Sequence, residues 1–112
     1  RTGSVALQEL AAGCVRNLSG HFQSQIVDQG GLDALMALLL APDSKLQEHG
    51  VVALRNISTK SSHDSAIVER GALAPLIALL RAASEVIQEH AAGTLRNLSA
   101  NLENKRRIVL DG

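Results

Sequence analysis

Residues 88–99 read Gln-Glu-His-Ala-Ala-Gly-Thr-Leu-Arg-Asn-Leu-Ser, and related versions of this stretch occur twice earlier in the chain. Residues 47–58 read Gln-Glu-His-Gly-Val-Val-Ala-Leu-Arg-Asn-Ile-Ser, and residues 8–19 read Gln-Glu-Leu-Ala-Ala-Gly-Cys-Val-Arg-Asn-Leu-Ser. The last two copies are 41 residues apart and the first two are 39 apart. Aligning residues 26–58 with 67–99 gives 16 identities in 33 positions. The period lies in the range of about 40–47 residues that is typical of helical solenoids.

Each period is predicted to contain three helices, of which the repeated motif forms the third. Within that motif, apolar positions recur at steps of four, four and three residues, which places them along one side of a helix. Residues that can accept a hydrogen bond from a helix start precede each copy, namely Ser4, Asp43 and Ser84. The three predicted apolar stripes are Leu7, Ala11, Val15 and Leu18; Leu46, Gly50, Leu54 and Ile57; and Ile87, Ala91, Leu95 and Leu98.

The first two helices of each period are predicted from glycines, prolines and apolar runs. Gly30, Gly71 and Gly112 follow short amphipathic segments and suit the left-handed conformation that ends a helix. Residues 32–41 and 73–82 are apolar on nearly every side, as in a helix held between neighbours. Pro75 falls in the first turn of its helix, and Pro42 separates two helices.

These motifs resemble the armadillo repeat over essentially the whole chain. The most specific parts are residues 47–58, 88–99 and Glu103-Asn104-Lys105-Arg106-Arg107-Ile108-Val109. They are more similar to beta-catenin, plakophilin and vacuole-associated armadillo proteins than to importin-alpha. In importin-alpha a tryptophan precedes the asparagine by four residues, whereas here Gly13, Val52 and Gly93 hold those positions.

The resemblance implies an all-α fold, a right-handed superhelical solenoid of three-helix armadillo repeats. The chain divides into the third helix of a partial repeat at 4–19, full repeats at 22–58 and 63–99, and the first helix of another repeat at 101–112. Such a section resembles part of a longer array. Because a repeat cannot bury its apolar faces alone, we expect Leu7, Val15, Ile108 and Val109 to lack packing partners.

Composition limits the functions to consider. Eleven basic and eleven acidic residues give a formal net charge of zero, and 1% of residues are aromatic. A nucleic-acid surface normally needs a basic excess, so nucleic acid is not an expected partner. No apolar run reaches the roughly 18 residues of a membrane span and no signal peptide opens the chain. The single cysteine indicates a reducing compartment, and we expect a cytoplasmic protein.

The resemblance implies that an extended peptide or protein segment binds along the concave face made by the third helices. Asn17, Asn56 and Asn97 each lie roughly 115° from the centre of the apolar stripe of their helix. An asparagine amide both donates and accepts, so a ladder of three could hold a peptide main chain. Alternatively, each caps a neighbouring loop or helix end. If the amides hold a ligand, replacing Asn56 and Asn97 by alanine should leave helical content and oligomeric state nearly unchanged. If they are caps, the same replacement should lower thermal stability.

Histidines and arginines share that face. His49 and His90 lie two turns before Asn56 and Asn97, where they could contact a ligand carbonyl or carboxylate, or only the next repeat. Arginines border the same face and could hold acidic ligand side chains; alternatively, they form ion pairs between repeats, since glutamates lie at a nearby angle. The arginines are Arg16, Arg55 and Arg96, and the glutamates are Glu9, Glu48 and Glu89. No metal site is expected, since no second ligand follows a histidine at three or four residues.

Catalysis finds no support in the sequence, because no motif joins a nucleophile, a base and an orienting acid. No phosphate-binding glycine loop occurs and no cofactor is expected. Cys14 aligns with Ala53 and Thr94 and is predicted to be a buried thiol, while residues 105–107 are predicted to form a solvated basic face. A competing hypothesis is a structural fragment that forms homo-oligomers through exposed terminal helices.

Overall fold

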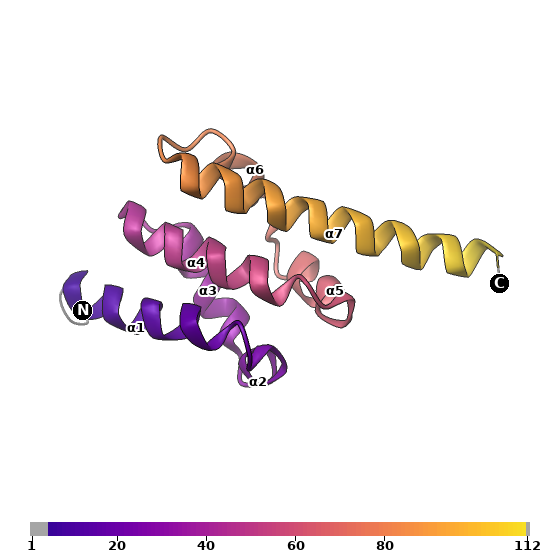
Figure 1. Cartoon of the computed structure of the whole chain (residues 1–112), viewed down its shortest axis with the longest axis horizontal. Coiled ribbons are helices and arrows are strands. Elements are labelled where there is room, and N and C mark those ends of the chain that lie inside the picture. The colour runs from indigo at the N-terminus through magenta and orange to yellow at the C-terminus, as the bar shows by residue number, and fades with distance from the viewer. Residues whose placement is uncertain (1–4, 112) are drawn as a thin grey trace.

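The computed structural model describes the backbone of residues 5–111 and the side chains of residues 6–101. All regular structure within this part of the chain is helical (Figure 1). The helices are α1(Val5–Leu18), α2(Gln23–Asp28), α3(Gly31–Leu39), α4(Ser44–Ile57), the short 3-10 helix η1(Ser61–His63), α5(Asp64–Glu69), α6(Leu73–Leu79) and α7(Glu85–Asp111). No helix within the described residues is long and apolar enough to cross a membrane.

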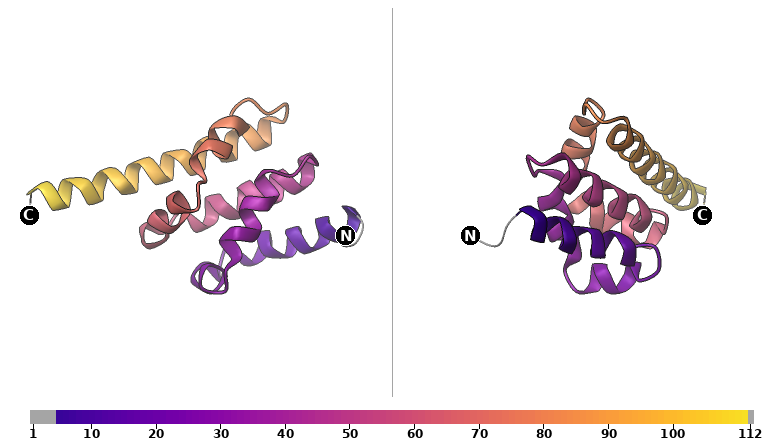
Figure 2. Two further views of the ribbon diagram at one scale, coloured as in Figure 1. Left: turned by 180° about the vertical axis from the view of Figure 1, so that it is seen from behind. Right: turned by 60° about the vertical axis from the view of Figure 1, so that its left-hand side comes forward.

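The three long helices form one layer of the molecule. Helix α4 lies between α1 and α7 and packs against both of them (Figure 1). Behind this layer, α3 packs on α4 and α6 packs on α7, as Figure 2 shows from the reverse side. Each repeat therefore contributes a second helix to one layer and a third helix to the other, which confirms the predicted solenoid of three-helix repeats.

Burial follows the predicted stripes in two of the three long helices. Leu54 and Ile57 of α4 are fully buried, and so are Ile87 and Leu98 of α7. They join one core cluster with leucines of α3 and α6. The same stripe on α1 is exposed, with Leu7 at 58% and Leu18 at 47%. Val15 is half-buried against the core, and the side chains of Ile108 and Val109 lie outside the described residues.

The helix ends depend on the predicted capping residues. The Asp43 carboxylate accepts a hydrogen bond from the Leu46 amide at 3.1 Å, and the Ser84 hydroxyl accepts one from the Ile87 amide at 3.3 Å. Gly30 and Gly71 have φ angles of 81° and 82°, so both adopt the predicted left-handed conformation. Pro75 lies in the first turn of α6 and Pro42 lies between α3 and α4, as predicted. Ser4 and Gly112 are outside the described residues.

Helix α7 extends across the repeat boundary predicted between residues 99 and 101. Its backbone continues without a break from Glu85 to Asp111. The physical reason is local, because Ala100, Asn101, Leu102 and Glu103 include strong helix formers and neither glycine nor proline. In contrast, Gly20 follows α1 and a run of serine, threonine and lysine follows α4. The partial repeat at 101–112 therefore stays a prediction.

Replacing Gly71 by valine should destabilise the fold through the backbone. No atom lies within 4 Å of a Cβ built at Gly71, so its positive φ angle is the source of the strain. A β-branched residue held there costs about 1–2 kcal/mol. We expect Gly71→Val to lower the melting temperature by roughly 4–15 °C in a domain of this size.

Gly20→Val is the matched control, because Gly20 has no positive φ angle and the nearest atom to its Cβ position is 3.9 Å away. The melting temperatures of both variants are measured by circular dichroism. Equal melting temperatures for the two variants would contradict the strained position of Gly71.

Candidate functional site

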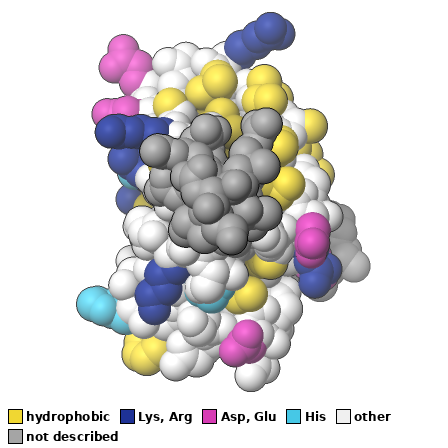
Figure 3. Space-filling view, turned by 90° about the vertical axis from the view of Figure 1, so that its right-hand side faces the viewer, with side chains coloured by type: hydrophobic (Ala, Val, Ile, Leu, Met, Phe, Trp, Pro, Cys, Tyr) yellow, Lys and Arg dark blue, Asp and Glu magenta, His cyan; other side chains and the backbone are white. Residues whose placement is uncertain are grey.

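The third-helix face is the outer side of the α1, α4 and α7 layer. Viewed along the long helices, many of the charged side chains lie at the left of the molecule and many of the hydrophobic side chains at its upper right, as Figure 3 shows. All the predicted binding residues belong to these three helices. We define the third-helix face by Arg16, Asn17, Glu48, His49, Arg55, Asn56, Glu89, His90, Arg96 and Asn97.

Two of the three asparagines bind a serine of the preceding repeat. Nδ2 of Asn56 donates to Oγ of Ser19 at 3.0 Å, and Nδ2 of Asn97 donates to Oγ of Ser58 at the same distance. Both serines are fully buried, and each serine hydroxyl donates in turn to a backbone carbonyl of its own helix. The asparagine amides therefore connect neighbouring third helices and are fixed in orientation.

These bonds bear on the expected stability of alanine variants at Asn56 and Asn97. The sequence predicts unchanged helical content if these amides hold a ligand and a loss of thermal stability if they cap a neighbouring element. Each donates a hydrogen bond between repeats, and a neutral hydrogen bond contributes about 0.5–1.5 kcal/mol net. We therefore expect their replacement to weaken the stack measurably.

The serine partners were missed by the sequence analysis. Serine stands two residues after the asparagine in all three copies of the motif, and this repetition is the signal that identifies it. Asn101 was missed as well; its Nδ2 donates to the backbone carbonyl of Ser58 at 3.3 Å. Ser58 thus accepts from two asparagines of α7.

The arginines also contact the next repeat. Nη1 of Arg16 donates to Nδ1 of His49 at 3.3 Å and lies 3.2 Å from Oε2 of Glu48. One repeat later, Nη1 of Arg55 donates to Nδ1 of His90 at 3.2 Å. Pairing between repeats, the alternative open in the sequence, therefore occurs at Arg16. Because a guanidinium has five N–H donors, both arginines keep donors beyond these contacts.

Gly93 makes room for Arg55 on this face. A Cβ at Gly93 would collide with Nε and Cζ of Arg55. Gly93 is the position at which importin-alpha has its tryptophan, and here the guanidinium of the preceding repeat lies over it. A Cβ built at Gly13 would instead lie 3.9 Å from the His49 ring, which is ordinary van der Waals contact.

The two remaining candidates have no such bonds. Asn17 and Arg96 are exposed, and neither side chain makes a hydrogen bond within residues 6–101. Asn17 lines a hollow of about 620 Å³ beside α1 together with His49, so the structure brings these two predicted residues together.

Cys14 lines the same hollow, and its predicted burial is wrong because the thiol is exposed. The aligned residues Ala53 and Thr94 are fully buried. They belong to α4 and α7, each of which has a third helix packed on the side of the preceding repeat. Among the described residues no helix covers α1 on that side.

His90 is held in its neutral form near pH 7. Burial lowers the pKa of His90, and the positive charges of Arg55 and Arg16 lower it further. The carboxylates of Glu89 and Glu48 act in the opposite direction and only partly offset this. A neutral ring agrees with the hydrogen bond from Arg55, because arginine only donates and Nδ1 must accept.

Helical repeats stacked through their third helices define a solenoid repeat protein. The sequence profile described as the armadillo/beta-catenin-like repeat matches residues 21–59 and 62–100, more than half of the chain. The chain belongs to the armadillo repeat family. No curated protein matches it.

Several solved structures are similar in fold. One engineered protein superposes with a TM-score of 0.83 at 30% identity, over 89% of this chain and 42% of the other. A designed armadillo repeat protein gives 0.75 at 25% identity, over 80% and 39%. Another designed armadillo repeat protein, solved with the peptide (KR)4, gives 0.68 at 24% identity, over 80% and 38%. The chain spans less than half the length of each of these structures.

Acid should weaken the fold through His90. A lowered pKa means that the unfolded chain binds a proton more readily than the folded chain, so stability falls as the pH drops below about 6.5. We expect His90→Gln to show a smaller loss of melting temperature between pH 7.5 and pH 5.5 than the unaltered protein.

His21→Gln is the control, because His21 is exposed in the turn after α1 and its side chain makes no hydrogen bond to an arginine within the described residues. Its acid-induced loss should equal that of the unaltered protein. The same loss in His90→Gln would contradict the assigned role of His90.

Proposed function

We propose that the protein is a peptide-binding module whose third-helix face holds an extended peptide by its main chain. The repeated, oriented asparagine carries this proposal. Asn56 and Asn97 each use Nδ2 to bind a serine, and no hydrogen bond to their Oδ1 occurs within the described residues. The carbonyl oxygen and the second N–H of such an amide can therefore accept from and donate to one peptide unit.

The binding of a peptide by a related fold supports this proposal. The designed armadillo protein solved with (KR)4 shares the helical architecture of this chain. Its ligand is not transferred, because 24% identity establishes the fold alone. Asn17 extends the row to α1, so three amides lie on three neighbouring helices that pack about 8–10 Å apart.

The charged residues of the face add side-chain contacts to the main-chain contacts. Arg96 is exposed beside Asn97 and can hold an acidic ligand side chain. The Arg55 guanidinium has only the neutral His90 as its hydrogen-bond partner within the described residues, so its charge is available to a ligand as well. Arg16 is neutralised by Glu48 and contributes less. His49 and His90 complete the proposed contact surface.

Replacing Asn56 and Asn97 together by alanine tests the ladder. Two amides that each make two hydrogen bonds to a ligand contribute about 2–4 kcal/mol, so affinity should fall roughly 30- to 1,000-fold. The measurement is a titration with a peptide selected from an array under reducing conditions. It is made well below the melting temperature of the variant.

The serine double variant Ser19→Ala with Ser58→Ala is the matched control. It removes the same two hydrogen bonds between repeats and leaves both asparagines in place. We expect a comparable loss of melting temperature with far less loss of affinity. Equal losses of affinity in the two double variants would mean that the asparagines act only as structural links.

Homo-oligomeric assembly is the second candidate function, favoured by exposed apolar residues at both ends of the stack. Leu7 and Leu10 of α1 are 58% and 69% exposed, and Ile77 of α6 is 55% exposed. Exposed apolar patches often mark interfaces. A contact between unlike ends would build open chains, whereas a two-fold contact would close as a dimer.

Sedimentation at about 100 μM distinguishes this candidate. We expect association that Leu10→Lys or Ile77→Lys weakens and that the asparagine double variant leaves unchanged. A monomer at this concentration would exclude assembly as the function of these surfaces.

A further inference from the structure

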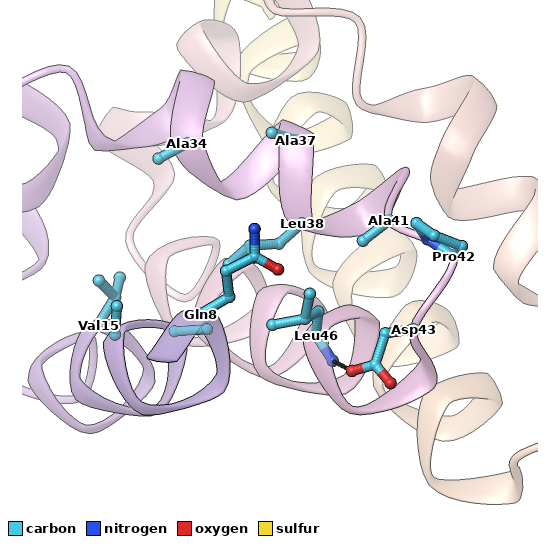
Figure 4. Close-up of a pocket in the computed structure, with 11 residues that line it drawn as sticks. Gln8, Val15, Ala34, Ala37, Leu38, Ala41, Pro42, Asp43 and Leu46 are labelled. Atoms are coloured by element: carbon cyan, nitrogen blue, oxygen red, sulfur yellow. Dashed lines mark hydrogen bonds between the residues drawn. The ribbon is translucent and has the colours of Figure 1, made fainter. Parts of the chain in front are cut away.

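The boundary between α4 and α7 lies inside the stack, where two complete repeats meet. The apolar groove of about 440 Å³ between α1, α3 and the start of α4 is different, because the internal repeat makes it the place where a second helix packs on α1 (Figure 4). Groups left open at the boundary between α4 and α7 do not depend on a neighbouring repeat in this way. They are therefore the better guide to a ligand.

The two boundaries between third helices have the same pair of side chains but a different charge. At the first, Nη1 of Arg16 donates to Nδ1 of His49 and also pairs with Oε2 of Glu48 at 3.2 Å. At the second, Nη1 of Arg55 donates to Nδ1 of His90 at 3.2 Å. No carboxylate of the described residues forms an ion pair with Arg55. The positive charge at the second boundary is therefore uncompensated.

The surface of α7 holds the Arg55 guanidinium in place. A Cβ at Gly93 would collide with Nε and Cζ of Arg55, so the guanidinium lies directly on the helix where a side chain is missing. The aligned residue at the first boundary is Val52, and its side chain prevents the same close approach of Arg16 to α4. His90 uses one of the five N–H donors of Arg55. The others are available on the third-helix face.

His90 would bind a proton more readily if a negative charge came close to it. Its Nδ1 accepts from Arg55, so the ring is neutral. Burial, Arg55 and Arg16 lower the pKa of His90, and Glu89 and Glu48 offset this only in part. A carboxylate bound to Arg55 would add an opposite charge beside the ring, and an opposite charge favours the charged form of a histidine.

Other titratable groups belong to α7 and to the elements packed against it. They are Lys45 and His49 of α4, His63, Asp64 and Glu69 of η1 and α5, and Glu85 and Arg96 of α7. Helix α6 has no ionisable residue. Within residues 6–101, the His90 ring is hydrogen-bonded to Arg55 alone. Arg55 is therefore the group through which the charge of a ligand would act on His90.

We propose that Arg55 and His90 form a subsite for an acidic side chain of the ligand, and that His90 gains a proton from solvent when the carboxylate binds. The inference rests on the proposed peptide face, because Asn56 and Asn97 of the same two helices would hold the main chain of that ligand. A protonated His90 no longer accepts from Arg55. Both side chains then donate, and the carboxylate accepts from both.

Acid should therefore strengthen the binding of an acidic peptide. His90 has a lowered pKa in the free protein and would have a higher pKa in the complex, so the complex binds a proton that the free protein lacks. Affinity then rises as the pH falls from 7.5 to 5.5. Glutamates of the ligand stay ionised over this range, since their ordinary pKa is about 4.3. If the carboxylate raises the proton affinity of the ring about tenfold, peptide affinity rises by up to about tenfold.

The probes are two fluorescein-labelled peptides, (Ser-Glu)4 and (Ser-Gln)4. Eight extended residues span about 26 Å, enough to cross three helices that pack about 8–10 Å apart. Anisotropy titrations are made at pH 7.5 and pH 5.5, well below the melting temperature. We expect (Ser-Glu)4 to bind about three- to tenfold more tightly at pH 5.5 than at pH 7.5, and (Ser-Gln)4 to depend little on pH. His90→Gln should remove the pH dependence of (Ser-Glu)4.

Gly93→Ala tests the geometry without removing a charge. Its methyl group would displace the guanidinium of Arg55, the movable end of a long side chain, while alanine favours a helix more than glycine does. The melting temperature should therefore not fall. We expect the preference for (Ser-Glu)4 over (Ser-Gln)4 to decrease about three- to tenfold, as it should in Arg55→Gln. Arg81→Gln is the matched control for charge and should keep the preference, because Arg81 is exposed in the loop after α6.

The outcomes separate the subsite from the asparagine ladder. Equal affinities of the two peptides at both pH values would overturn the subsite, as would a preference for (Ser-Glu)4 that Gly93→Ala retains. A pH dependence that His90→Gln does not remove would overturn the role of His90. The Asn56→Ala, Asn97→Ala variant should weaken both peptides by a similar factor, and that result would support the ladder even if the subsite failed. If neither peptide binds, the subsite is wrong, and the peptide selected from the array still tests the ladder.

Discussion

The close approach of each second helix to its third helix is the constraint on which the structure depends. At Gly50, α3 comes so near to α4 that a Cβ would meet Leu38 at 2.7 Å. This proximity lets Leu35, Leu54 and Ile57 bury completely in one cluster. Because the stripe of α4 is fixed against α3, the residues between the stripe positions face the neighbouring long helices. The close contact of Gly50 with α3 fixes the rotation of α4 about its axis. This rotation places Arg55 and Asn56 on the third-helix face.

The side chains that link the repeats on the third-helix face are the same ones that we propose to contact a ligand. Asn56, Asn97, Arg16 and Arg55 all donate across the boundary between repeats. These contacts stabilise the stack, and they also fix side chains that would otherwise rotate freely. A ligand that meets oriented donors loses less conformational entropy in ordering them. Structural links and ligand contacts are therefore compatible, since each amide and each guanidinium has more hydrogen-bonding groups than the stack uses.

The architecture could be predicted from the sequence because the apolar spacing of each helix is a local property. The same spacing occurs in every copy of the repeat, which strengthens the prediction. The caps at Asp43 and Ser84 and the left-handed Gly30 and Gly71 follow from the chemistry of single residues. Properties that depend on neighbours were not predictable in this way. Cys14 is exposed although its aligned residues are buried, since burial depends on which helix lies beside it. The Asn56 to Ser19 bond joins residues 37 apart in the sequence, and no spacing within one helix reveals it.

The apolar contacts of the core and the hydrogen bonds of the third-helix face contribute different amounts to stability. Truncating a fully buried leucine such as Leu54 typically costs about 2–5 kcal/mol, whereas a neutral hydrogen bond contributes about 0.5–1.5 kcal/mol. The apolar contacts between second and third helices therefore dominate the stability of each repeat, and the polar contacts between third helices adjust how repeats are aligned. Polar residues of the third-helix face can consequently change with the ligand while the core keeps the helices in place. The same reasoning explains why Leu7 and Leu18 of α1 are exposed, because within the described residues no second helix packs on that stripe.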